Sequence, residues 1–409
     1  MLRVLLLISL VIIIGGSIFA FIHFKSSSDK TQTDSVVDKV KDLIPSGSEA
    51  EKRGKSLSNG HCEGMEKPKL GTLPMNYDDF SMIIPYGAVI GDHVIPIDHQ
   101  YFSPTIFRSP RDTYEVRAMA DAKLVAVEPR KKPDYTEYRM VFSMSCRLFY
   151  YYDLVTSLSP DIQKVTGDPD DKSYKRDVNI PVKEGQLIGR IGGQTLDFAV
   201  WDTEKVLSGF LDPKQYEAER WKIHTVDPLD YYTEKLKNQA LSKYLRTIEP
   251  RSGKIDYDID GRLIGNWFLE GSKGYEGTKS ISLENYSQTH LAIIPDHLDP
   301  ATYIASFGNY GGLFKQLVIV SPQIDPKDVS MESGLVKYGL DEYNFETPDG
   351  EMWTGITFAQ NLRVRLRGTT HACVLYQLIE KRKLKMEAFP STPCSKVLSF
   401  TSEAKMYYR

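Results

Sequence analysis

The hydrophobic and polar positions of the chain alternate over short runs, most clearly between residues 182 and 202. After a Gly-Gly turn, residues 195–200 read Thr-Leu-Asp-Phe-Ala-Val. Successive side chains of a strand point to opposite faces of a sheet, so Thr195, Asp197 and Ala199 are predicted on one face and the apolar residues on the other. The pattern predicts a strand, with Asp197 either as a solvating charge or as a ligand in a site.

Comparable short runs, separated by turn residues, fill residues 66–215 and 251–409. Turns at this spacing indicate barrels or sandwiches. For residues 251–409 we predict an antiparallel β-barrel-like domain, because closure of a barrel leaves no sheet edge exposed. The chain is therefore expected to be mainly β, with one β-sheet domain at 66–215 and a second β domain at 251–409.

Residues 216–250 carry a different pattern and are predicted to form a helical segment that connects the two β domains. Asp227-Pro228 is a helix-start signal, because Asp caps a helix and Pro fits its first turn. Pro250 ends the pattern. Between these points, apolar residues recur at three- and four-residue spacing, as one face of a helix requires. They are Leu229, Tyr232, Leu236, Ala240 and Tyr244.

The N-terminal run from Leu2 to Phe24 is almost wholly apolar. About 20 such residues cross a bilayer as a helix, so residues 1–24 are predicted to be a transmembrane anchor. A cleaved signal peptide is the competing interpretation. Residues 25–65 are rich in Ser, Asp and Lys and are predicted to be a disordered spacer, because such a segment has too little apolar surface to bury.

The overall composition is that of a globular protein, with 409 residues, 41% hydrophobic and 26% charged. A net charge of -3 gives no electrostatic case for nucleic acid as a partner. The 24 tyrosines favour strands.

The four cysteines divide into one pair for each predicted β domain, Cys62 with Cys146 and Cys373 with Cys394. Disulfides persist in oxidising compartments, so these pairs and the anchor together predict a single-pass membrane protein with most of its chain outside the cytoplasm. Four buried thiols in a cytosolic protein are the alternative.

The segment VKEGQLIG at 182–189, followed by TLDFAV, resembles the last core segment of the lysostaphin-type (LytM-like) zinc metallopeptidases. That family has V-x-x-G-Q-x-I-G, a Gly-rich turn and then H-x-H-F-E-V. The runs YEVRAMADAKLVAV and YRMVFSMSCRLFYYYDLV resemble two earlier strands of the same family. Thr195 and Asp197 stand where the two histidines are expected, and Asp153 takes the place of a catalytic histidine before Leu154.

The resemblance also implies a His and an Asp zinc ligand from an H-x-x-x-D motif. The nearest match is HVIPIDH at 93–99, in which His93 pairs with Asp98, one residue too far along, or with His99. Together with Asp197, these residues would present nitrogen and oxygen ligands to Zn²⁺. The alternative interpretation is that they cap a turn around Pro96 and hold no metal.

These substitutions predict a degenerate domain without peptidase activity. No cofactor is expected, and zinc bound without hydrolysis is the alternative. Asp153 and Thr195 are vestigial catalytic positions, since an unperturbed Asp has lost its proton at neutral pH and Thr is neither acid nor base there. The expected function is binding or scaffolding at the cell envelope, with a glycan, peptide or protein as partner. The alternatives are a zinc metallopeptidase with an altered ligand set and a small-ligand carrier built on the C-terminal barrel.

Overall fold

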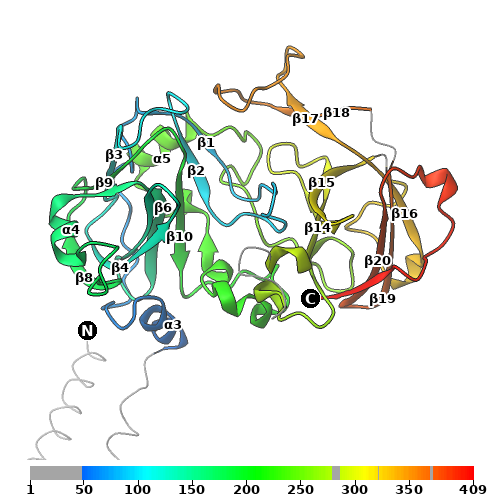
Figure 1. Ribbon diagram of the computed structural model, residues 1–409, viewed down its shortest axis with the longest axis horizontal. Helices are drawn as coiled ribbons and strands as arrows, with labels where there is room; N and C mark the ends of the chain where they lie inside the picture. The colour runs from blue at the N-terminus through cyan, green and yellow to red at the C-terminus, as the bar shows by residue number, and fades with distance from the viewer. Residues whose placement is uncertain (1–47, 279–285, 321, 369–371) are drawn as a thin grey trace, which may run out of the picture. The chain divides into compact units, whose positions relative to one another are not determined.

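The computed structural model describes residues 48–278, 286–320, 322–368 and 372–409 (Figure 1). The predicted transmembrane anchor at residues 1–24, and the predicted spacer up to residue 47, lie outside the described residues. Within those ranges, no helix has both the length and the apolar character needed to span a membrane.

The first β domain is built on an eight-stranded antiparallel sheet. A smaller three-stranded sheet is formed by strands that lie between those of the large sheet in sequence. The order in the large sheet is β1-β2-β10-β6-β5-β4-β8, with β11 also pairing to β10. Its strands are β1 (Phe80–Ile84), β2 (Gln100–Pro104), β10 (Leu196–Asp202), β6 (Leu148–Val155), β5 (Thr136–Ser143), β4 (Ala122–Lys131), β8 (Asp177–Val182) and β11 (Thr225–Val226). The small sheet contains β3 (Tyr114–Arg117), β9 (Leu187–Ile191) and β7 (Ser157–Leu158).

Strand β10 has the alternation that the sequence predicts, and both of its faces are buried. Leu196, Phe198 and Val200 belong to one core cluster. Ala199 and Trp201 belong to another, which also contains residues of the second β domain. Because neither face is open to water, Asp197 is a buried carboxylate and not a solvating charge at an edge.

The second β domain is a closed antiparallel barrel, as predicted. Its strands are β12 (Gly265–Leu269), β13 (His290–Pro295), β14 (Tyr303–Tyr310), β15 (Leu313–Val320), β16 (Val336–Asp341), β19 (Ala372–Glu380), β20 (Lys383–Phe389) and β21 (Lys405–Tyr408), and a separate hairpin joins β17 (Tyr343–Glu346) to β18 (Arg363–Leu366). Buried side chains such as Trp267, Phe307 and Tyr376 form one cluster with alternate residues of all eight strands. An eight-stranded barrel is just wide enough for side chains to fill it, and these side chains form the core of the second domain.

The segment between the two β domains is not the continuous helix that its periodicity predicted. It divides into the 3-10 helices η1 (Pro213–Glu219), η2 (Lys222–His224) and η3 (Pro228–Asp230), strand β11, and the helix α5 (Glu234–Leu241). Thr233 caps α5 separately from Asp227, which caps η3, so a second helix start lies within the periodic run. The five apolar residues of the pattern are nevertheless all buried in the core of the first domain.

The predicted disordered spacer is wrong from residue 49, where the helix α3 (Glu49–Leu57) begins. A Cβ atom on Gly54 would lie 1.8 Å from the carbonyl oxygen of Cys146, so only glycine permits this close packing. The disulfide Cys62–Cys146 fixes the same region to the first domain. The sequence prediction failed because it rested on the composition of the segment, and composition does not register a close glycine contact.

Both predicted disulfides are present, Cys62–Cys146 and Cys373–Cys394, and no described cysteine is free. The remaining helices are α4 (Pro160–Thr166) and the 3-10 helices η4 (Gly274–Glu276), η5 (Tyr286–Thr289), η6 (Met331–Ser333) and η7 (Cys394–Lys396).

Candidate functional site

A cavity of about 320 Å³ lies beside β10 and collects most of the sequence-predicted site residues. It is lined by the loop from Asp92 to His99 and by polar side chains of β2, β4, β5, β6 and β10. Residues of η1 and η2, together with Tyr275, Tyr286 and His290, complete the lining. Among the predicted residues it includes His93, Asp98, His99, Asp153 and Asp197, whereas Thr195 is not among the lining residues.

Strand register places three of the polar groups next to one another. Asp197 on β10 is directly opposite Tyr101 on β2 and Asp153 on β6. Residues directly opposite in neighbouring strands project from the same face of a sheet. His99, just before β2, completes the group, because its Nε2 lies 3.3 Å from Asp197 Oδ2 and 3.1 Å from the Tyr101 hydroxyl.

Asp98 is paired with a lysine that the sequence analysis did not identify. Lys222 on η2 is 2% exposed, and its Nζ lies 2.9 Å from Asp98 Oδ1. Burial alone would raise the pKa of Asp98, but the Lys222 ammonium and His99 lower that pKa well below its usual range. The negative charge of Asp98 is therefore retained inside the protein and balanced by a side chain.

Asp153 is held by two arginines. Arg139 Nε lies 3.0 Å and Arg130 Nη2 lies 2.9 Å from Asp153 Oδ2. The Arg139 guanidinium also packs over the rings of Tyr151 and Trp221, at 5.2 and 5.0 Å from their centroids. Asp153 is therefore the carboxylate shared by the two arginines of this ion-pair network.

Asp197 differs from the other two carboxylates because burial raises its pKa to about 7, against the opposing effect of His99. Burial lowers the pKa of His99, but the carboxylates of Asp197 and Asp98 raise it by more, so the net shift of His99 is upward. The Asp197–His99 pair can thus hold and exchange a proton near neutral pH.

The predicted metal ligands do not fit a zinc ion as the side chains are arranged. The described ranges contain no group of three or more His, Cys, Asp or Glu residues that could hold a metal. The side chain of His93 is 47% exposed and is bonded to Asp92. The Lys222 ammonium on Asp98 also places a positive charge where the ion would need a carboxylate ligand, and like charges repel.

Sequence reasoning missed Lys222, Arg130 and Arg139, which supply the positive charge of the site. A signal for Arg139 is present in the sequence, since it stands within the apolar run Tyr-Arg-Met-Val-Phe at 138–142. A charge inside a buried run is retained only when it is paired. Its partner could not be found from sequence, because Asp153 lies on the neighbouring strand.

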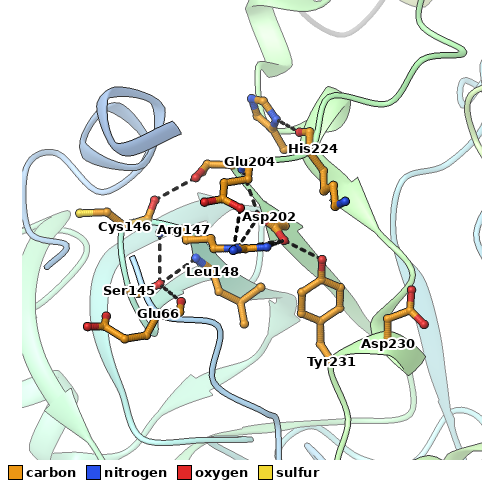
Figure 2. A network of polar contacts seen from close by, with 12 residues as sticks. Glu66, Ser145, Cys146, Arg147, Leu148, Asp202, Glu204, His224, Asp230 and Tyr231 are labelled. Atoms are coloured by element: carbon orange, nitrogen blue, oxygen red, sulfur yellow. Dashed lines mark hydrogen bonds and ion pairs between the residues drawn. The ribbon is translucent and has the colours of Figure 1, made fainter. Parts of the chain in front are cut away.

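A second polar network secures the C-terminal end of β10, away from the cavity (Figure 2). Asp202 is fully buried and accepts hydrogen bonds from the Tyr231 hydroxyl, at 2.7 Å, and from Arg147 Nη2, at 3.1 Å. Thr203, the next residue, donates to the carbonyl of Cys146 at 3.1 Å. These contacts connect β10, the η3 region and the first disulfide.

No protein-family model matches the chain, and no match was found among curated proteins. The resemblance to lysostaphin-type metallopeptidases therefore remains a prediction from the sequence motifs.

Proposed function

We propose that this chain is a membrane-anchored extracytoplasmic binding or scaffolding protein of the cell envelope, built on a metallopeptidase-like domain that does not hydrolyse peptides. The observation that supports this best is the buried Lys222–Asp98 ion pair. It supplies, from a side chain, the positive charge that an active relative takes from zinc. The location rests on the apolar run at 2–24 and on the two disulfides.

Hydrolysis by a metallopeptidase needs a metal that activates water and a group that carries the proton to the leaving amine. Asp98 is committed to Lys222, and Asp153 is committed to Arg130 and Arg139. These ion pairs occupy Asp98 Oδ1 and Asp153 Oδ2, so a metal ion would have to compete with cationic side chains that are already in place. The cavity beside β10 is therefore suited to binding without hydrolysis.

The alternative, a metallopeptidase with an altered ligand set, is favoured by one observation. Asp197, with a pKa raised to about 7 by burial, lies next to His99 and has the properties of a general base. This alternative requires a metal site that includes Asp197 or His99. A measurement of bound metal therefore distinguishes it from the proposed function.

Elemental analysis of the purified full chain separates the two functions. We expect metal well below one equivalent, no cleavage of cell-wall peptides with or without added zinc, and co-sedimentation with insoluble cell-wall material. One equivalent of zinc that disappears in Asp197→Ala, but not in the exposed control Asp349→Ala, together with peptide cleavage, would establish the metallopeptidase instead.

The location has its own test. The chain should fractionate with membranes and should show no reactive thiol when it is denatured without reduction. Four reactive thiols in the protein isolated from cells would contradict the extracytoplasmic assignment.

A further inference from the structure

Two buried side-chain atoms of the cavity wall lack a hydrogen-bond partner within the described residues. Asp98 is 5% exposed, and its Oδ2 has no hydrogen-bond partner within the described residues. His99 Nδ1, also buried, makes no hydrogen bond there and lies 3.5 Å from Asp98 Oδ1. Buried polar atoms are nearly always hydrogen-bonded, so an unbonded acceptor on the wall of a cavity indicates a ligand or water that donates to it.

The charges of the cavity argue against an anionic ligand. Its three cationic side chains are already paired, Lys222 with Asp98 and the two arginines, 130 and 139, with Asp153. A phosphate or carboxylate would therefore meet carboxylates without gaining a free cation among the described lining residues. Burying an uncompensated charge is costly, which favours a neutral ligand.

The strands around the cavity also argue against an extended peptide. β2, β6 and β10 each pair with a strand on both sides, so they offer no free edge for a peptide strand to join. Recognition at this position must come from side chains that surround a compact ligand.

The apolar part of the wall and the size of the cavity suit a small ring. Tyr275 and Tyr286 line the cavity, with ring centroids 5.2 Å apart, and residues 94–97 contribute aliphatic surface. A volume of about 320 Å³ is near the lower limit of the roughly 300–1,000 Å³ typical of small-molecule pockets. Tyrosine rings offer an apolar face together with a polar tip, a combination that matches the C–H faces and hydroxyls of a sugar.

From these observations we propose that the cavity binds a neutral, hydroxyl-rich ligand, a single sugar unit of a glycan, with Asp98 accepting from one of its hydroxyls and Tyr286 packing on its ring. This inference rests on the proposed binding function and specifies which part of the envelope the chain recognises. Asp98 is a ligand-binding residue in this proposal, and Lys222 is the residue that positions its carboxylate.

The test is calorimetric titration of the full chain in detergent with N-acetylglucosamine and with glucose, and with inorganic phosphate and a glycine pentapeptide for contrast. We expect saturable binding of at least one sugar and none of phosphate or peptide. Tyr286→Leu should weaken sugar binding by about tenfold or more, since it removes the ring that packs on the ligand. The matched control Tyr135→Leu, at an exposed tyrosine outside the cavity, should leave binding unchanged.

Asp98→Asn provides a second variant, and it should weaken sugar binding similarly. Absence of saturable sugar binding, binding of phosphate or peptide in its place, or equal affinity in Tyr286→Leu and the wild-type chain would overturn the inference. Co-sedimentation with cell-wall material but no sugar binding would refute the inference and leave the proposed function standing. Stoichiometric zinc with peptide cleavage would refute the proposed function itself.

Discussion

Lys222 Nζ lies 2.9 Å from Asp98 Oδ1, and both side chains are buried. Their distance in sequence is large, but η2 and the loop before β2 bring them to the same cavity wall. A buried pair of this kind contributes little net stability relative to apolar residues, whereas loss of one partner leaves a charge without compensation.

Lys222→Met is therefore expected to lower the free energy of unfolding by about 3–5 kcal/mol, because Asp98 then remains buried and unpaired. The double variant Lys222→Met/Asp98→Asn should recover a large part of this loss. Urea unfolding followed by tryptophan fluorescence measures both. Lys235→Met, at an exposed position of α5, is the control and should change little. A single variant as stable as the wild-type chain would show that the pair is not buried in solution.

The strand pattern could be predicted from sequence wherever burial is alternating or one-sided. The barrel follows from the period-two pattern that a sheet imposes, and the same pattern predicted which residues of β10 share a face but not that both faces are buried. The helical periodicity at 229–244 predicted burial correctly but continuity wrongly, because residues spaced by three or four can be buried by several short helices as well as by one. Thr233, an N-cap within the run, is the residue that breaks it.

Only the acidic and histidine residues of the candidate site were predicted from the sequence, and their basic partners were not. The acidic and histidine side chains were named because the sequence resembles a family motif that contains ligands at these positions. Their partners Lys222, Arg130 and Arg139 were not, because an ion pair between distant segments has no signature in either segment alone. His93, the nearest match to the motif histidine, lies in a turn closed by the Ile90–His93 bridge, and its side chain is 47% exposed.

Asp197 predicts how stability depends on pH. Burial raises its pKa to about 7, so between roughly pH 4, where the unfolded carboxyl titrates, and pH 7 the folded chain binds the additional proton. The free energy of unfolding should therefore fall as pH rises through this window. His99, whose pKa is also raised, adds a loss in the same direction above its unfolded value.

Asp197→Asn removes the titrating proton and should flatten this decline. The groups that face Asp197 and must be kept intact are His99, Tyr101, Asp153 and Arg139. Thermal unfolding at a series of pH values measures the effect, with the exposed Asp349→Asn as the control. An equally steep decline in Asp197→Asn would mean that Asp197 is already ionised in the folded chain throughout this pH window.

Tyr231 ties the η3 region to β10 through its hydrogen bond to Asp202 (Figure 2). Tyr231→Phe should cost about 1.5–3 kcal/mol, the usual contribution of a hydrogen bond to a charged group, while Arg147 keeps the carboxylate paired. Tyr77→Phe removes an exposed tyrosine hydroxyl that contacts Ser242, and is the matched control. Equal stability of the two variants would argue against a structural role for this contact.

The burial of residues 229–244 determines to which domain this segment belongs. Tyr232, Leu236 and Tyr244 belong to the core of the first domain, so a chain cut before Asp227 should leave that domain unable to fold. Cleavage after residue 251 keeps the segment with its core. Limited proteolysis followed by circular dichroism of the isolated fragments distinguishes an integral segment from the predicted connector.

The two disulfides close loops of very different length, with sequence separations of 84 for Cys62–Cys146 and 21 for Cys373–Cys394. A crosslink restricts the unfolded chain more when the loop is longer, which favours the first disulfide by about 1 kcal/mol in the chain-entropy description. Its removal also loosens the segment that contains α3, because the crosslink at Cys62 fixes the end of that segment to Cys146. The double variant Cys62→Ser/Cys146→Ser should therefore lose more stability than Cys373→Ser/Cys394→Ser, and hydrogen exchange should increase at residues 49–62 in the first variant alone. A larger loss in the second variant would show that local packing around the barrel disulfide outweighs loop length.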